Sequence, residues 1–398
     1  MTDIDPYAGE RPKLSPFHPR QAALNIRDAW GVWNGYKFAN YYYDAEYEYF
    51  CVRNQCGTYD ICPMQKYEIS GPDAETMLNR MVTRDVRKLP VNRVAYAVWC
   101  TDAGRIIDDG TIFRLAEDHF ILKCGSPCSA WLRKSAFGFD NVTITDITDA
   151  LAGLALQGPT SCAVLKKMGL GGIENAKPFD ILHFPFRDET LRVSRTGFTG
   201  ELGYELWIRR ELALELWDSL YAAGEDYGIQ PYGEYATNMA RLEAGFIMPY
   251  LDFTEALKTV HFQHDQTPFE LQLGWLVDFD KPHFNGRKAL LEEQQRGPAW
   301  QLVRLDIEGN WPAEGAIIYD TEKCRQDIGY VTSAMWSPAV KANIALAMIR
   351  AQFLDGDIWV EIYKAKDLRP YRRMARAKII SKQFWAPARA RATPPPDY

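Results

Sequence analysis

The segment "RTGFTGELGYELWI", residues 195 to 208, begins like a loop and ends like a strand. Between Thr196 and Gly203 it holds three glycines and two threonines, which favour a tight turn because glycine adopts backbone conformations closed to other residues. A strand then begins near Gly203 and carries Glu205. The pattern predicts a turn whose backbone approaches a flat partner closely, with a carboxylate delivered on the strand behind it.

A chain of 398 residues is too long for one small core, so we expect two or three domains. The net charge of -6 argues against a general nucleic-acid binder. The first residues lack the apolar stretch of a signal peptide, and no apolar run reaches the roughly 20 residues of a membrane helix. These features predict an intracellular, cytoplasmic protein that has no membrane partner.

The eight cysteines form no CxxC pair, and none stands beside a histidine at metal-ligand spacing. We therefore expect free and mostly buried thiols. His261 and His264 form an HxxH pair, but no carboxylate lies between them and no third ligand is evident. The sequence predicts no metal site.

A small α+β unit is predicted over residues 63–147. Residues 93–124 alternate as strand, turn, strand, turn and strand. Another strand precedes them and ends at Gly71. The segment "DAETMLNRMV" between them is typical of an amphipathic helix that Asp73 caps.

Residues 1–62 and 148–250 are predicted to form one discontinuous domain. A buried strand at 151–157 is followed by a Gly158-Pro159 break and a helix, for which Thr160 or Ser161 is the expected cap. Hairpin strands over 180–209 and two helices complete this domain.

The remaining chain divides into a connecting segment at 251–296, a domain at 297–385 and an end at 386–398. The pattern of short strands and turns after residue 297 predicts a β-barrel. The closing "RARATPPPDY" is expected to be an unpacked tail.

Three acidic or basic groups are candidates for chemistry. Asp108 and Asp109 follow a turn, and their side chains should point to opposite faces of a strand. Glu205 follows the glycine turn, and Arg241 with Glu243 lies on a predicted helix, where arginine suits a planar partner. Each also has an ordinary alternative, as a solvated strand acid or a structural ion pair.

The order of the short motifs is more specific than any one of them. From about residue 45 to about residue 380 the chain holds, in this order, "CGTYDI", "GRIIDDG", "LALQGP", "RTGFTGELGYEL", "ARLEAG", "LGWLVDF", "FNGRKAL" and "SAMWSPAVKANIALAMI". With this series the chain resembles the folate-dependent glycine-cleavage T-protein family, which includes aminomethyltransferases and tetrahydrofolate-dependent demethylases.

The resemblance implies an α+β, three-domain fold in which tetrahydrofolate occupies a central channel. It implies that Glu205 holds the pterin ring, that Arg241 orients the bound ligands, that Asp108 is the catalytic acid and that Tyr96 accompanies it. A buried carboxylate suits the pterin because it accepts two N–H donors side by side. The N5 atom of the folate would then accept the one-carbon unit.

Several neighbours of these positions depart from the glycine-cleavage pattern. Phe198 replaces the usual tyrosine of the turn, Pro63 replaces a histidine, and Cys100-Thr101 replaces Leu-Asn just after Trp99. We place Phe198 and Trp99 in the folate pocket and expect a donor other than an aminomethyl-lipoyl protein.

The donor itself stays open between a sulfonium, a methylated ammonium compound and a methyl ether. Aromatic faces suit a cationic donor, and no histidine near the motifs could protonate an ether. The candidate aromatic residues, which core packing would explain equally well, are Trp30, Trp33, Tyr36, Tyr41, Tyr42, Tyr43 and Trp99.

Two other functions remain open: an aminomethyltransferase of glycine cleavage, with a lipoyl carrier protein as partner, and a folate-binding regulatory or repair protein that transfers nothing.

Ten Lys or Arg residues after residue 363 are either a solvated face or a site for the folate polyglutamate tail.

Overall fold

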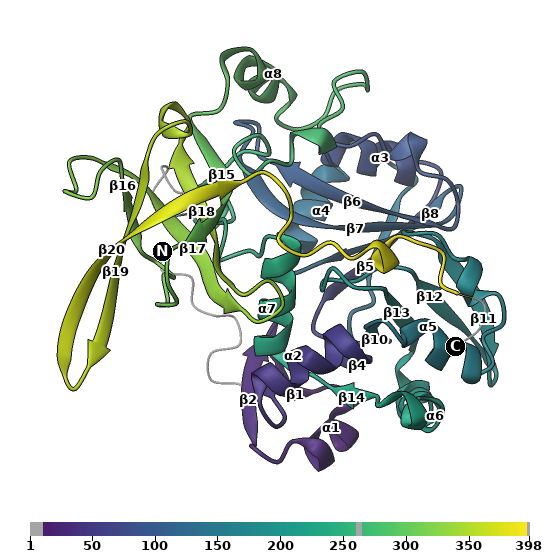
Figure 1. The fold of residues 1–398 in the computed structure, drawn as a ribbon. Helices are drawn as coiled ribbons and strands as arrows, with labels where there is room; N and C mark the ends of the chain where they lie inside the picture. Colours follow the sequence, from purple (N-terminus) through teal and green to yellow (C-terminus); the bar gives the residue numbers. More distant parts are fainter. Residues whose placement is uncertain (1–10, 260–264, 396–398) are drawn as a thin grey trace.

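The computed structural model describes residues 11–259 and 265–395 and forms three lobes (Figure 1). His261 and His264 lie outside the described residues. The described part of the chain mixes helices with four sheets, one of which is a closed barrel. The predicted α+β class with a C-terminal β-barrel is confirmed.

The first lobe is built on a six-stranded sheet in the order β11-β12-β13-β10-β4-β14. All its neighbours are antiparallel except β4 and β14. The strands are β4 (Gly57–Asp60), β10 (Leu151–Gln157), β11 (Ile181–Phe186), β12 (Glu189–Ser194), β13 (Gly203–Arg209) and β14 (Gln230–Pro231). A smaller sheet holds β1 (Lys13–Leu14), β2 (Ala29–Trp33) and β3 (Tyr36–Tyr41).

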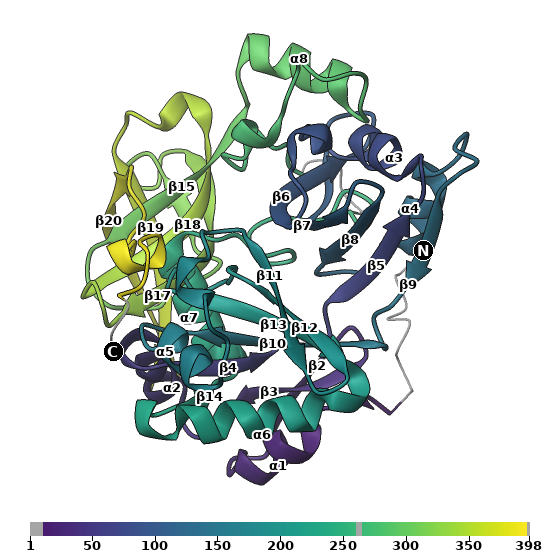
Figure 2. The ribbon, with the colours of Figure 1, turned by 90° about the vertical axis from the view of Figure 1, so that its right-hand side faces the viewer.

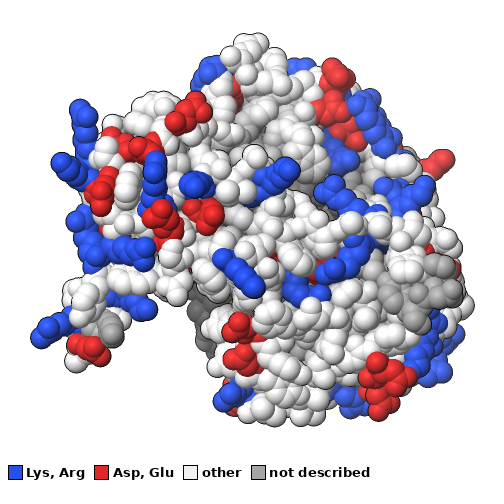
Figure 3. All heavy atoms as spheres, in the orientation of Figure 1, with Lys and Arg blue, Asp and Glu red and all other residues white. Residues whose placement is uncertain are grey.

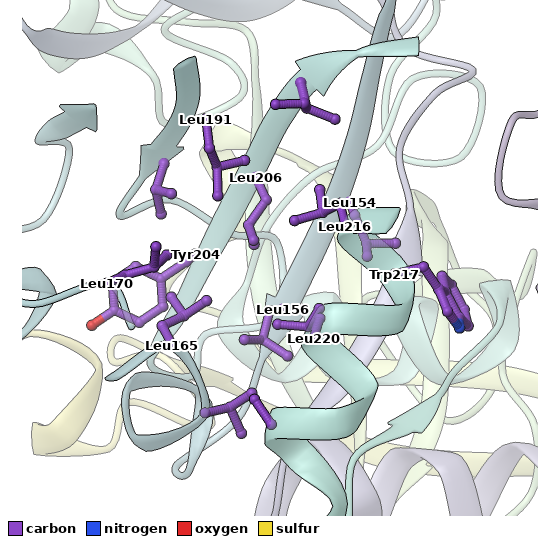
Figure 4. Packing of buried hydrophobic residues seen from close by; sticks show 14 of the residues in the cluster. Leu154, Leu156, Leu165, Leu170, Leu191, Tyr204, Leu206, Leu216, Trp217 and Leu220 are labelled. Atoms are coloured by element: carbon purple, nitrogen blue, oxygen red, sulfur yellow. The ribbon is translucent and has the colours of Figure 1, made fainter. Parts of the chain in front are cut away.

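Helices cover the first lobe and close its core. They are α1 (His18–Leu24), α2 (Ala45–Asn54), α5 (Ser161–Lys167), α6 (Ala213–Gly224) and α7 (Glu234–Ala244). Figure 4 shows the apolar side of α6, with Leu216 and Leu220, against Leu154, Leu156 and Leu206 of the central strands. The i, i+4 spacing of these leucines places them on one helix face.

The second lobe is a five-stranded sheet in the order β6-β7-β8-β5-β9. Its elements are β5 (Gln65–Ser70), α3 (Ala74–Met81), β6 (Arg93–Cys100), β7 (Ile106–Ala116), β8 (His119–Cys124), α4 (Ser129–Ser135) and β9 (Thr143–Asp146). Met77, Leu78 and Met81 of α3 are fully buried against the sheet, as their helical spacing predicts.

The third lobe is a closed six-stranded barrel, preceded by α8 (Arg287–Arg296). Its order is β15-β18-β17-β16-β19-β20, and each neighbouring pair is antiparallel. The strands are β15 (Trp300–Ile307), β16 (Ile317–Tyr319), β17 (Asp327–Ser337), β18 (Ala342–Arg350), β19 (Ile358–Lys366) and β20 (Arg369–Ile380). Helix α7 contacts β17 and β18, so the first lobe and the barrel meet at this helix (Figures 1 and 2).

Basic side chains gather on the barrel, including the β19–β20 hairpin at the left of Figure 3. Part of this charge is neutralised within the lobe, since Arg372 pairs with Glu361 and Arg376 pairs with Asp357. No helix in the described ranges 11–259 and 265–395 has both the length and the apolar character needed to cross a membrane.

Two predictions of helix caps were wrong. The side chain of Asp73 does not cap α3 and instead accepts a hydrogen bond from the backbone N–H of Asn141 at 2.9 Å. Helix α5 has no side-chain cap from Thr160 either. Ser161 is already its first residue, and its hydroxyl donates to the carbonyl of Leu202 at 3.4 Å.

The expected C-terminal tail is packed as far as residue 395. Residues Ala388–Ala390 form a 3-10 turn, and Arg389 binds Glu201 with two hydrogen bonds of 2.8 and 2.9 Å. The Arg195 side chain donates to the carbonyls of Ala390 and Ala392. A proline-rich stretch that cannot build its own element is thus held by side chains of the first lobe.

Candidate active site

The glycine turn before β13 is wrapped around one buried side chain, that of Gln157. Its amide Nε2 donates to the carbonyls of Thr196 and Tyr204, and its Oε1 accepts from the Thr199 hydroxyl at 2.9 Å. A Cβ atom at Gly197 or Gly203 would lie 1.9 or 2.3 Å from the Gln157 amide, a distance that no side chain tolerates. Gly197 and Gly203 therefore allow the close approach of Gln157, which fixes where β13 begins.

Glu205 is the third residue of β13, paired with Ala155 of β10 and Ser194 of β12. Burial raises the pKa of this carboxyl group, while Lys123 and the hydroxyls of Thr196 and Ser194 act in the opposite direction. The side chain is thus half-buried, with two neutral donors and one cation near it. Such a carboxylate is a strong acceptor for a ligand that brings N–H groups.

The acid pair lies on β7, directly after a bulge in its pairing with β6. Asp108 stands opposite Trp99, and the register then shifts so that Cys100 pairs with Ile106. The bulge inserts one residue into β7 and changes the local twist, which re-aims the side chains that follow.

The two aspartates differ in their surroundings. Asp108 is 2% exposed, its Oδ1 accepts from the backbone N–H of Asp109 at 2.8 Å, and its Oδ2 has no hydrogen-bond partner among the described residues. Asp109 is half-buried and accepts from the Tyr96 hydroxyl at 2.6 Å. The structure therefore joins Tyr96 to the second aspartate rather than to the first.

The pKa values of both aspartates are raised. Burial is the main cause for each, and it raises the pKa of Asp109 to about 6 and that of Asp108 well above its ordinary value. The charge of Asp109 acts further on Asp108, and Glu255 raises the pKa of both. A carboxyl group with a pKa near neutrality can exchange protons with a reacting nitrogen.

Glu255 is a third carboxylate of this region and gave no signal in the sequence. It is 3% exposed, and it accepts from the Ser126 hydroxyl at 2.5 Å and pairs with Lys258 at 2.6 Å. Ser126 follows β8, so this contact connects the 251–259 segment to the edge of the second lobe beside the acid pair.

Arg241 is fully buried and satisfied by internal partners. Its guanidinium forms an ion pair with Asp252 and donates to Asn238, to the carbonyl of Phe246 at 3.1 Å and to Ser333 of the barrel at 2.8 Å. The structure thus places Arg241 at the junction between the first lobe and the barrel, and any contact with a ligand remains a prediction.

The two predicted aromatic pocket residues lie in different environments. Trp99 is fully buried in the core of the second lobe, and its indole N–H has no hydrogen-bond partner in the described part of the chain. Phe198 lies in the glycine turn, 38% exposed, and stacks on Phe246 with ring centroids 5.6 Å apart.

The other aromatic residues proposed for a donor are mostly used in packing. Lys37 covers Trp30 at 4.5 Å from the ring centroid, Tyr36 donates to Asp149, and Tyr41 stacks on Tyr235. Trp33 contacts the second lobe, since its indole N–H donates at 3.2 Å to the carbonyl of Gly125, the residue after β8.

The sheets of the first and second lobes share one apolar cluster. Trp207 of β13 and Tyr59 of β4 pack in it with Phe113 of β7 and Ile121 of β8. Between Phe113 and Trp207 lies the ammonium group of Lys123, a residue that the sequence analysis did not single out. Its only sequence signal is a lone charge in the apolar run "FILKC".

The structure thus brings Glu205 and Lys123 together between two lobes and places the acid pair, Tyr96 and Glu255 along the same second-lobe sheet. These carboxylates can receive N–H donors and protons. The described ranges 11–259 and 265–395 contain no group of three or more His, Cys, Asp or Glu side chains that could hold a metal ion. The raised pKa values of the acid pair support acid–base chemistry at this site.

Comparisons with known proteins give one consistent result. Residues 21–281 match the GCVT N-terminal domain, and residues 301–384 match the glycine cleavage T-protein C-terminal barrel domain. The crystal structure of the glycine cleavage system aminomethyltransferase T from Bartonella henselae superposes with a TM-score of 0.81 at 26% identity, covering 94% of this chain and 98% of that one.

Two curated relatives have different names. An aminomethyltransferase of Caldanaerobacter subterraneus is 33% identical over 350 residues, which cover 85% of this chain and 87% of the relative. A trimethylamine-oxide aldolase of Ruegeria pomeroyi is 34% identical over 395 residues, which cover 95% of this chain and 48% of the relative. The chain therefore spans about half the length of that aldolase.

Proposed function

The chain belongs to the glycine cleavage T-protein family, and from this premise we propose that it moves a methyl group from a small methylated donor to N5 of tetrahydrofolate. The resemblance found in the sequence is confirmed. The family consists of folate-dependent one-carbon transferases, so tetrahydrofolate is the acceptor. The identity of the donor is the new part of the proposal.

One observation supports the proposal most strongly: the Glu205 carboxylate on β13 and the acid pair on β7 belong to the sheets of two lobes that share an apolar cluster. In this arrangement Glu205 accepts two N–H groups of the pterin ring. The acid pair serves the reacting nitrogen, with Asp109 held in place by Tyr96. Binding on one sheet and proton transfer on the other allow the ligand to be aligned before it reacts.

The methyl group is transferred by direct displacement at its carbon atom. The lone pair of N5 attacks the methyl carbon, and the bond between that carbon and the donor nitrogen or sulfur breaks with its electron pair on the leaving group. The N5 proton passes to the carboxylate of Asp109, whose pKa of about 6 leaves it mostly ionised at neutral pH. Asp108 couples to this proton through its contact with Asp109.

A donor whose methylated atom carries a positive charge, as in a methylammonium, an amine oxide or a sulfonium compound, fits the charges around the acid pair. Asp108, Asp109 and Glu255 are three carboxyl groups, and Lys258 is the cation that pairs with Glu255. The half-buried Tyr96 ring lies 6.3 Å from that of Trp275, which is 66% exposed, so aromatic faces border the same region. The similarity to a trimethylamine-oxide aldolase agrees with a donor that carries its methyl groups on nitrogen.

Aminomethyl transfer from a lipoyl protein is the second candidate, because several relatives of matching length are named aminomethyltransferases. Isotope labelling separates the two. Donors with CD3 groups on nitrogen, sulfur or oxygen are incubated with enzyme and tetrahydrofolate, and the folate product is analysed by mass spectrometry. We expect 5-methyltetrahydrofolate that retains all three deuterium atoms from a nitrogen or sulfur donor.

Three results would reject the proposal in distinct ways. Retention of two deuterium atoms would show transfer at the level of a methylene group. Ammonia release and folate modification only with aminomethyl-lipoyl protein would establish the second candidate. Tetrahydrofolate binding with no transfer from any donor would indicate a folate-binding regulatory protein.

A further inference from the structure

Three lysines of the described chain are almost completely buried: Lys66 is 0% exposed, Lys123 1% and Lys281 3%. An ammonium group removed from water needs hydrogen-bond acceptors, because it otherwise loses its hydration without replacement. These three residues therefore provide a direct comparison within one molecule.

Lys66 and Lys281 meet this requirement in full. Each ammonium group donates to three backbone carbonyl oxygens at distances of 2.5 to 3.2 Å. The acceptors are Cys62, Met64 and Thr148 for Lys66, and Asn79, Val82 and Arg84 for Lys281. Both lysines tie separate segments of the chain together, which is a structural role.

Lys123 has no such acceptors. Its ammonium lies 3.4 Å from the ring centroid of Phe113 and 3.1 Å from that of Trp207, and it makes no hydrogen bond or ion pair to any described residue. Burial lowers its pKa well below the ordinary value, and the charge of Glu205 opposes this shift. The two aromatic faces stabilise a cation but leave its N–H donors unused.

Folding alone does not account for a lysine at this position. An apolar side chain of similar length would fill the space between the two rings without the cost of an unsatisfied buried amine. The carboxylate whose charge acts on Lys123 is that of Glu205. Burial raises its pKa, and its nearby hydrogen-bond donors are two hydroxyl groups, so it has acceptor sites left for further donors. An amine with unused donors and a carboxylate with spare acceptors are therefore neighbours in one interior site.

We propose that Lys123 is a further folate-binding residue, which donates a hydrogen bond to the 4-oxo oxygen of the pterin while Glu205 accepts from its 2-amino and N3–H groups. This inference rests on the proposed function. The three pterin groups lie side by side on one ring edge as donor, donor and acceptor, so a carboxylate and an amine together satisfy all of them. The charged and the neutral amine both carry N–H donors, so the contact forms in either protonation state.

The contact between Lys123 and the 4-oxo oxygen would also discriminate between pterins that differ at position 4. A pterin with an amino group in place of the 4-oxo oxygen offers Lys123 no oxygen acceptor, and its N3 carries no hydrogen for Glu205, so both contacts are weakened. Lys123 and Glu205 together therefore favour the 4-oxo form of the ring.

The test combines a protein change with a ligand change. Dissociation constants of tetrahydrofolate and of its 4-amino analogue are measured by calorimetry for the wild type and for Lys123→Met. We expect the substitution to weaken tetrahydrofolate binding about 5- to 100-fold, the range from a neutral hydrogen bond to a charged one, and to change binding of the 4-amino analogue by less than about threefold.

Thermal unfolding of the ligand-free proteins provides the structural control. Lys123→Met should melt at the wild-type temperature or above it, whereas Lys66→Met, which leaves three buried carbonyl groups without their donor, should melt lower or fail to fold. A Lys123→Met protein that melts several degrees lower or does not fold overturns the inference, because the lysine would then be structural.

The two levels of the proposal fail in different ways. Equal losses for both ligands, or no loss for either, overturn the role of Lys123 while tetrahydrofolate binding by the wild type leaves the proposed function standing. A wild type that does not bind tetrahydrofolate at all overturns both.

Discussion

Buried charges at the junction between the first lobe and the barrel are fully matched, whereas those between the first and second lobes are not. At the junction, Asp252 receives Arg241 together with hydrogen bonds from Thr332 and Ser333. Glu243 likewise receives the Arg53 guanidinium and the Tyr49 hydroxyl at 2.6 Å. Both of these carboxylates therefore have a cation and neutral donors within the chain.

The opposite holds between the first and second lobes. Lys123 lacks a hydrogen-bond acceptor in the described part of the chain, Asp108 has one oxygen without a partner there, and the pKa of Glu205 is raised by burial. Buried polar groups are normally satisfied, and exceptions cluster where a ligand completes them. The difference indicates that one set of ions holds lobes together and the other set awaits a bound molecule.

The junction should respond to substitution mainly through stability. Arg241→Met leaves Asp252 buried without its cation, so we expect the free energy of unfolding to fall by about 3–5 kcal/mol. Urea denaturation followed by tryptophan fluorescence measures this loss.

A second substitution tests the cause of that loss. Asp252→Asn, introduced into the Arg241→Met protein, should restore part of the stability because the uncompensated charge is gone. If Arg241→Met were as stable as the wild type but bound tetrahydrofolate poorly, Arg241 would be a ligand residue rather than a junction residue.

Substitution in the acid pair should mainly lower the turnover rate. Asp109→Asn removes the proton acceptor beside Tyr96, so we expect a loss in kcat of about 100- to 1,000-fold, with Asp108 retaining part of the function. Steady-state rates with saturating tetrahydrofolate and donor measure it. Thermal stability should stay within a few degrees of the wild type, because a neutral amide is no costlier to bury than a carboxylate.

The pH profile of the wild type checks the same assignment. Because the base must be ionised, activity should fall as the pH drops through about 6, the pKa to which burial raises Asp109. Loss of this acidic limb in Asp109→Asn is the expected result. An unchanged limb would assign it to another group.

Substitution of Glu205 should mainly weaken the binding of tetrahydrofolate. Glu205→Gln keeps the shape but loses the charge and one acceptor site, so tetrahydrofolate should bind about 10- to 100-fold more weakly. Calorimetry gives the dissociation constant, and the melting temperature should not fall, because burial already disfavours the carboxylate. An unaltered dissociation constant would exclude Glu205 from the pterin site.

Local patterns in the sequence were enough to predict the second lobe. Strand alternation over residues 93–124 and the stripe of Met77, Leu78 and Met81 both report burial on one face, and short turns fix which strands pair. The pattern of short strands and turns also predicted the β-barrel, in which half of the neighbouring strand pairs are consecutive in sequence.

Features that depend on distant segments could not be predicted in this way. Gln157 determines the glycine turn from about 40 residues away, and Lys123 meets Trp207 across a lobe boundary. Neither contact leaves a periodic signal. The caps proposed at Asp73 and Thr160 show the converse, because side chains of the favoured type were present but had other partners or geometry.

Among the ion pairs of the matched buried carboxylates, the one between Arg389 of the C-terminal segment and Glu201 should contribute least to stability. Arg389 binds Glu201 at 2.8 and 2.9 Å, but 41% of its side chain is exposed, and Glu201 also receives the Trp385 indole N–H at 2.9 Å. Arg389→Ala should therefore lower the free energy of unfolding by only about 1 kcal/mol, as measured in urea.

Tetrahydrofolate affinity should be unchanged in Arg389→Ala, because Glu201 keeps Trp385 and the nearby Arg53 as partners and the turn before β13 stays anchored on Gln157. The matched exposed substitution Arg187→Ala, which removes an ion pair with Glu215 on the surface of the first lobe, gives the baseline for a loss of surface charge. A drop in folate affinity in Arg389→Ala alone would mean that the C-terminal segment positions the turn that carries Glu205, so that the two sets of buried charges are coupled through Glu201.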